Sequence, residues 1–107
     1  MSNGIIAGNA LGITVLTATV DLGSVAANTS EEETATVTGV KSGDYVAVVK
    51  PSLEAGIILG TVRVTADDTV AIQVVNTTAG AIDAASESMT FLVIRPSDTT
   101  ATAVLTS

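Results

Sequence analysis

The sequence contains no histidine, cysteine or tryptophan, and its only aromatic residues are Tyr45 and Phe91. Histidine is the commonest general base in enzymes, cysteine is the strongest nucleophile, and both are the usual ligands of zinc. A Ser–His–Asp triad and a typical zinc site are therefore excluded. Hydrolysis by two carboxylates remains formally open, but one tyrosine and one phenylalanine make a poor platform for a sugar. We predict that the protein is not an enzyme and that it has no catalytic, metal or cofactor-binding residues.

Basic residues are also scarce. Lys41, Lys50, Arg63 and Arg95 stand against eleven acidic residues, and the net charge is −7. Nucleic-acid binding needs clustered lysine and arginine to neutralise phosphates, and anionic membranes attract proteins in the same way. We therefore expect neither nucleic acid nor membrane as a partner. Residues 1–12 show no basic segment of a secretory signal, which predicts synthesis in the cytoplasm.

The apolar residues are small. The chain of 107 residues has the size of one domain, and 47% of it is hydrophobic, mostly alanine and valine. A buried aromatic side chain removes roughly 150–250 Å² from water, so a core almost without aromatics depends on many small side chains. Such a chain either packs two sheets closely or buries further surface against copies of itself. We expect both.

Residues 60–76 (GTVRVTADDTVAIQVVN) show the clearest local pattern. Apolar and polar residues alternate around Val62 and Val64, two aspartates follow, and the alternation resumes over residues 70–74. This period of two predicts a β-hairpin with one apolar face, on which Ile72 points inward. Dense β-branched and apolar residues predict further strands over residues 13–20, 33–40, 44–50 and 89–95.

Short strands separated by turns about every ten residues are typical of an all-β sandwich or small barrel. We predict a small β-sandwich, jelly-roll-like or Ig-like, over residues 13–96. For residues 1–12 we predict a flexible N-terminal arm or a short first strand. For residues 97–107 we predict a C-terminal strand or tail. Residues 76–88 form the longest polar connection, and residues 81–89 have room for a turn or two of helix at most.

Two acidic clusters are candidate binding sites. The run Glu31, Glu32 and Glu33 could hold a cation or a basic partner, although a solvated loop before a strand explains it better. Asp67 and Asp68 could bind calcium through oxygen ligands, but the spacing of an EF-hand is absent. Aspartate in a hairpin turn is expected for backbone reasons alone. Neither cluster is assigned as a site.

Several segments together carry a family likeness. They are Gly43-Asp44 before a strand, Ala55-Gly56, the hairpin over residues 62–75, NTTAGAID at 76–83 and TFLV at 90–93. In this order they resemble small β-rich proteins encoded among the head genes of tailed bacteriophages, which are capsid decoration, or cement, proteins. The likeness covers about residues 18–96, and its motifs are structural, so it brings no active site with it.

The resemblance implies a non-enzymatic virion structural protein on the capsid exterior that bridges subunits of the major capsid protein. Such proteins assemble as trimers at threefold axes or dimers at twofold axes, and we expect a homo-oligomer, with a trimer favoured. Candidate contact surfaces are one face of residues 89–94 and the run Ile57, Ile58 and Leu59, for both of which ordinary core packing is an equally good reading.

Other functions are less well supported. The main alternative is a tail or head-fibre module that binds a host surface glycan, against which the scarcity of aromatic residues counts. An Ig-like module of a bacterial surface protein usually occurs in tandem and behind a signal peptide.

Overall fold

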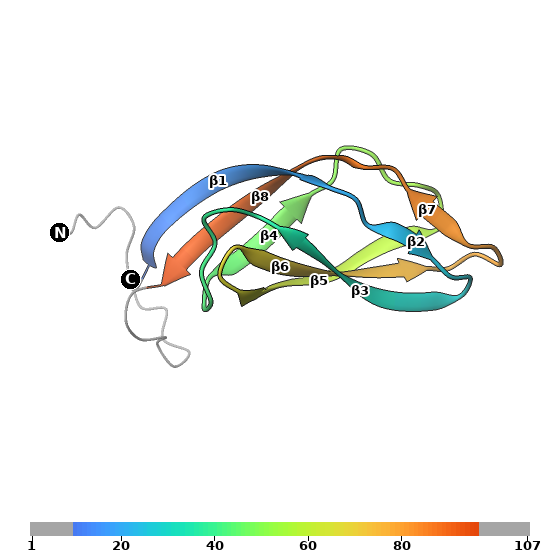
Figure 1. The fold of residues 1–107 in the computed structure, drawn as a ribbon, viewed down its shortest axis with the longest axis horizontal. Helices are drawn as coiled ribbons and strands as arrows, with labels where there is room; N and C mark the ends of the chain where they lie inside the picture. The colour runs from blue at the N-terminus through green and yellow to red at the C-terminus, as the bar shows by residue number, and fades with distance from the viewer. Residues whose placement is uncertain (1–9, 97–107) are drawn as a thin grey trace, which may run out of the picture.

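The computed structural model describes residues 10–96, which form eight β-strands and no helix (Figure 1). The predicted all-β sandwich is confirmed. The strands are β1 (Ala10–Val20), β2 (Gly23–Val25), β3 (Thr29–Thr36), β4 (Tyr45–Val49), β5 (Ile57–Ala66), β6 (Thr69–Asn76), β7 (Ile82–Ala84) and β8 (Glu87–Pro96).

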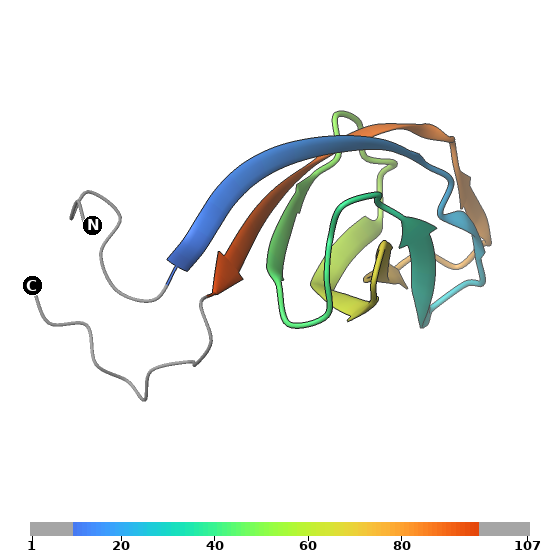
Figure 2. The same ribbon diagram turned by 60° about the vertical axis from the view of Figure 1, so that its left-hand side comes forward.

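All strand pairs are antiparallel and they form three sheets. One sheet has the order β1-β8-β4, a second has the order β3-β6-β5, and a small third sheet joins β2 to β7. The pairs β1–β8, β2–β7 and β3–β6 nest inside one another, so the chain resembles a long hairpin wound on itself. The pairs β4–β8 and β5–β6 lie outside this nesting and complete the two larger sheets. Figure 2 shows the two larger sheets facing each other, with β1 and β8 extending beyond the other sheet at one end.

The core lies between the two larger sheets. Met89, Phe91 and Val93 face inward from β8, and Val70, Ile72 and Val74 face them from β6, all at most 2% exposed. Both strands are central in their sheets, as expected for apolar strands that are covered on at least one side.

The register predicted for the hairpin is confirmed. Val62 pairs with Ile72 and Val64 pairs with Val70, so all four side chains lie on the core side, while Gln73 is exposed on the other side. The turn between the strands contains Asp68 with φ of 62°, a left-handed conformation that aspartate adopts more readily than most residues.

Some predicted boundaries were wrong. β3 begins at Thr29 and ends at Thr36, so the three glutamates lie inside a strand and not in a loop, and residues 37–40 leave the sheet. The short strands β2 and β7 lie in segments predicted as connections, and the helical turn proposed for residues 81–89 is replaced by β7 and the start of β8. The cause is that these segments find partners far away in the chain, which local propensity does not report.

The predicted terminal segments fall mostly outside the described part of the chain. The arm was predicted to end at residue 12, but Ala10 already pairs with Pro96, and the strand continues from there. Residues 1–9 and the predicted C-terminal strand or tail at 97–107 lie outside the described residues.

Candidate functional site

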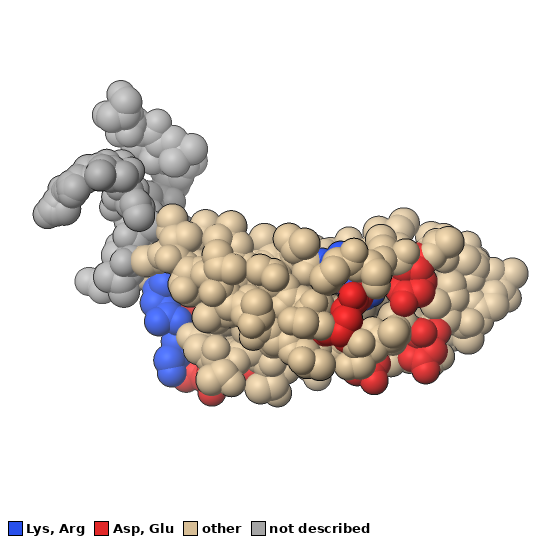
Figure 3. Space-filling view, turned by 90° about the horizontal axis from the view of Figure 1, so that it is seen from above, with Lys and Arg blue, Asp and Glu red and all other residues tan. Residues whose placement is uncertain are grey.

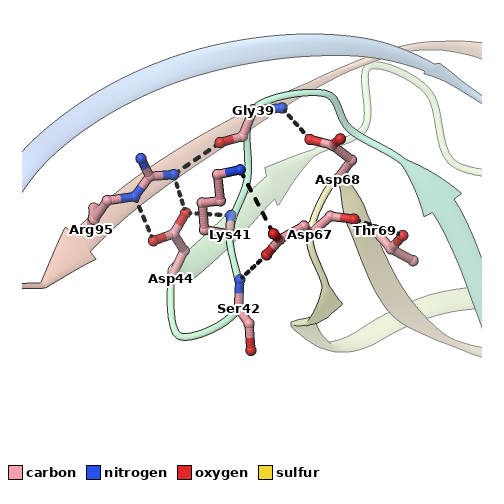
Figure 4. Close-up of polar contacts among 8 residues, drawn as sticks. All are labelled: Gly39, Lys41, Ser42, Asp44, Asp67, Asp68, Thr69 and Arg95. Atoms are coloured by element: carbon pink, nitrogen blue, oxygen red, sulfur yellow. Dashed lines mark hydrogen bonds and ion pairs between the residues drawn. The ribbon is translucent and has the colours of Figure 1, made fainter.

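Polar side chains join the loop before β4 to the ends of other strands (Figure 4). Asp44 accepts hydrogen bonds from Arg95 Nε at 2.9 Å and Nη2 at 2.7 Å, and from the backbone N–H of Lys41 at 2.8 Å. Arg95 Nη2 also donates to the Gly39 carbonyl at 2.9 Å. The hydrogen bond from Arg95 outweighs burial and lowers the pKa of Asp44. This cluster holds the loop in place and leaves no free carboxylate for chemistry.

The candidate calcium ligands at the hairpin turn belong to the same network. Asp68 Oδ1 accepts the backbone N–H of Gly39 at 2.9 Å, and Asp67 Oδ1 accepts that of Ser42 at 3.1 Å (Figure 4). Lys41 Nζ lies 3.7 Å from Asp67 Oδ2. Both aspartates, which lie in the turn between β5 and β6, therefore bind the loop that precedes β4. Within residues 10–96, no three His, Cys, Asp or Glu side chains are grouped to hold a metal ion.

A buried cation lies near the far end of β4. The Lys50 side chain is 2% exposed, and its ammonium forms ion pairs with Glu87 and, at 3.4 Å, with Glu54. Burial opposes the charge of Lys50, but the two glutamates outweigh it and raise its pKa. Glu54 also accepts the backbone N–H of Ala85 at 3.3 Å. These contacts tie the loop after β4 to the start of β8, which is a structural role.

The three glutamates of β3 point in two directions. Glu31 and Glu33 pair with Val74 and Ile72, so they lie on the core side at the edge of the sheet. Burial and the neighbouring Glu31 raise the pKa of Glu33. Glu32 lies on the opposite side, where its carboxylate accepts two hydrogen bonds from Arg63, at 2.8 and 2.7 Å, which lower its pKa. The acidic run is thus split between two faces and does not form one cation site.

The outer face of the β1-β8-β4 sheet carries no charged residue among those described. Two rows of side chains cross its three strands in register: Ile13, Ile94 and Tyr45, and then Val15, Leu92 and Ala47. Ile13 is 49% exposed, Val15 61%, Tyr45 53%, Val49 65% and Leu92 41%. The remaining members of the face are threonine and serine: Thr17, Thr19, Ser88 and Thr90.

The outer face of the β3-β6-β5 sheet is different. The ion pair between Glu32 and Arg63 spans it, and its other exposed residues include Thr34, Gln73 and Thr61. The same sandwich therefore has one polar, charged face and one uncharged, largely apolar face. Figure 3 views the molecule from the side of β1 and β8: charged groups of both signs lie at one end, further charged groups, mostly acidic, lie towards the other end, and largely uncharged surface lies between them. We call the outer side of the β1-β8-β4 sheet the uncharged face.

Two candidate contact surfaces were predicted from the sequence. The first was one face of residues 89–94, and in the structure the two sides of this strand have different roles. Met89, Phe91 and Val93 are core, whereas Leu92 and Ile94 belong to the uncharged face. In the second run, Ile57 is 3% exposed and Leu59 packs against the core, so only Ile58 is exposed, on the other sheet.

Sequence reasoning missed the contributions of β1 and β4 to the uncharged face. The sequence contained a signal for these contributions, because both strands have apolar residues on their two sides. Val15 lies beside Leu16 in β1, and Val49 lies beside Val48 in β4. A strand on a solvated sheet face normally alternates apolar and polar residues.

Comparison with known proteins gives no relative for this chain. No family model, curated protein or solved structure matches it. In the described range, no helix is long and apolar enough to cross a membrane.

Proposed function

We propose that the protein is a non-enzymatic structural subunit of a bacteriophage virion, which decorates the outside of the capsid and links subunits of the major capsid protein. The observation that carries the proposal is the uncharged face, where five large apolar side chains are each 41–65% exposed. Contiguous apolar surface of this kind marks sites where another molecule binds. On the outer face of the opposite sheet, Ile58 is the only large apolar side chain exposed to this degree among the described residues, so the apolar surface is concentrated on one side.

The resemblance of residues 18–96 to capsid decoration proteins suggests which assembly buries this face. A decoration protein needs a rigid module that binds by surface contact, and it needs no reactive group. The described ion pairs support the rigidity, since Asp44 with Arg95 and Lys50 with Glu87 tie loops to β8. Glycan binding is less well supported, because Phe91 is buried and Tyr45 is therefore the only aromatic side chain available to stack on a sugar.

The proposal predicts that a major capsid protein is encoded near this protein, and capsids assembled from that capsid protein provide the test. Purified protein is mixed with capsids that lack it, the capsids are sedimented through a gradient, and their temperature of disruption is measured. We expect the protein to sediment with the capsids and to raise that temperature. Protein that stays at the top of the gradient, or a gene neighbourhood without a capsid protein, would overturn the proposal.

Two charge-matched variants locate the contact. Val15→Lys places a cation on the uncharged face, and Thr34→Lys places one at an exposed edge-strand position of the other sheet. Both change the net charge by the same amount. We expect Val15→Lys to weaken capsid binding and Thr34→Lys to leave it close to that of the wild type. Equal binding by all three proteins would show that the uncharged face makes no contact within the assembly.

A further inference from the structure

We propose that the uncharged face binds the uncharged face of a second copy of this chain, so that two copies form a symmetric, face-to-face pair. This inference rests on the proposed function in taking the face as a surface that becomes buried in the assembly, and it names a second copy, and not the capsid, as the molecule that covers the face. Two features of the described residues favour a second copy, namely the distribution of charge and the arrangement of the apolar rows, and the size of the face predicts how strongly the pair associates.

The charge distribution comes first. The net charge of −7 makes two copies repel each other. On the other sheet the outer face carries Glu32 paired with Arg63, and the edge of β3 adds Glu31 and Glu33, so a contact along that edge brings carboxylates of two copies together. The uncharged face has no described carboxylate or ammonium group, and a copy that approaches it meets the least repulsion.

The apolar rows suit a twofold axis. In a symmetric pair the same surface is used twice, so it has to be complementary to itself. Leu92 lies on the central strand with Val15 and Ala47 as its neighbours on each side. When two such faces stack with their strands about 30° apart, as packed sheets do, apolar rows meet apolar rows. Tyr45 at 53% exposure adds a large side chain with a polar end, a residue type enriched at interfaces.

The size of the face predicts a weak pair. Its strands have 11, 10 and 5 residues. At about 3.4 Å per residue and about 4.8 Å between strands, the face measures on the order of 400 Å² in projection. A standard interface buries about 800 Å² on each partner, so we expect dissociation in the micromolar range or above. Neighbouring copies on a shell would be held at high effective concentration, which strengthens a weak contact.

Sedimentation equilibrium of the isolated protein, without capsids, tests the pair. We expect the mass of the wild type to rise from one copy towards two as concentration increases. Val15→Lys should raise the dissociation constant about tenfold or more, because it buries a cation without a partner, whereas Thr34→Lys should not. If general repulsion governed association, both lysine variants would associate more strongly than the wild type, since each removes one unit of net negative charge. Thermal melting of each variant checks that it is folded.

A second measurement uses the absence of cysteine from the chain. Leu92→Cys and Gln73→Cys each place one thiol at an exposed position of a central strand, on the uncharged and on the polar face. Under mild oxidation we expect Leu92→Cys to form disulfide-linked dimers much faster than Gln73→Cys. Equal rates for the two variants would overturn the pair.

Other outcomes separate this inference from the proposed function. A wild type that stays monomeric yet binds capsids through Val15 overturns the pair and leaves the proposed function standing. A trimer also overturns it, because a face that packs on itself closes at two copies. A dimer that responds to Val15→Lys but does not bind capsids supports the pair and contradicts the proposed function.

Discussion

Arg95, the penultimate residue of β8, holds the carboxylate of Asp44 through two hydrogen bonds of 2.9 and 2.7 Å across 51 positions of the sequence. The Asp44 side chain is 2% exposed, so this pair is shielded from water on one side. Removing one member of such a pair leaves the other charge poorly compensated.

We predict that Asp44→Asn lowers the free energy of unfolding at neutral pH by about 2–3 kcal/mol. Because folding lowers the pKa of Asp44, its contribution is present above the usual carboxyl pKa and disappears as the pH falls through the lower folded value. The difference between wild type and variant should therefore shrink in acid. Urea unfolding at several pH values measures it, with Asp83→Asn at an exposed position as the control. A difference independent of pH would contradict the assignment.

We predict that Glu33→Gln stabilises the protein at neutral pH. Folding raises the pKa of Glu33, so its contribution to stability is complete below the usual pKa and is lost as the pH rises through the folded value. The gain from the variant should vanish in acid, where wild-type Glu33 is protonated. Glu32→Gln is the matched control, because it removes the same charge but breaks the pair with Arg63. If both variants shift the melting temperature upward equally, net charge and not burial is the cause.

We predict that Gly56→Ala costs about 1–3 kcal/mol of stability. Gly56 has φ of 88°, and a methyl group there would collide with Cγ2 of Thr78. Gly80→Ala, where the added methyl meets open space, should change stability little. In the double variant Gly56→Ala/Thr78→Ser, the colliding methyl is gone while the hydroxyl is kept, so part of the loss should be recovered. Additive effects in this cycle would rule out the collision as the cause.

We predict that Ile72→Asp unfolds the domain, whereas Gln73→Asp leaves it folded. Ile72 is 0% exposed in the centre of the core, and its neighbour Gln73 points to solvent from the same strand. Burying an unpaired carboxylate costs a free energy comparable to the whole free energy of unfolding of a typical domain, which is about 5–15 kcal/mol. Circular dichroism and thermal melting of the two variants distinguish them. A cooperative transition close to that of the wild type in Ile72→Asp would mean that the register is shifted by one residue.

The parts of the fold that were predictable are those in which the local pattern determines the structure. The hairpin was correct because Val62, Val64 and Ile72 alternate with polar residues, and a shift by one would expose all of them. β2 and β7 were missed because each has three residues and gains its pairing only from the other, about sixty positions away. The strand position of the three glutamates was missed for a related reason, since their partner is the apolar β6.

The candidate site was predictable only in fragments. One face of residues 89–94 was recognised as a candidate contact surface, but Ile13 and Tyr45 become neighbours of Ile94 only once β1 and β4 are known to flank β8. A strand with apolar residues on both sides does not reveal which side is core. The alternation shows which residues share a side of the strand, but not on which side the second sheet packs.

The central claim is that the uncharged face becomes buried on assembly, and Tyr45 reports on it most directly. It is the only tyrosine in a chain without tryptophan, and it lies on that face at 53% exposure. Quenching of its fluorescence by acrylamide is measured on the isolated protein across the concentration range in which its mass rises. The account predicts that quenching falls in step with association. Quenching that stays constant while the mass doubles would show that the copies meet elsewhere and would contradict the account.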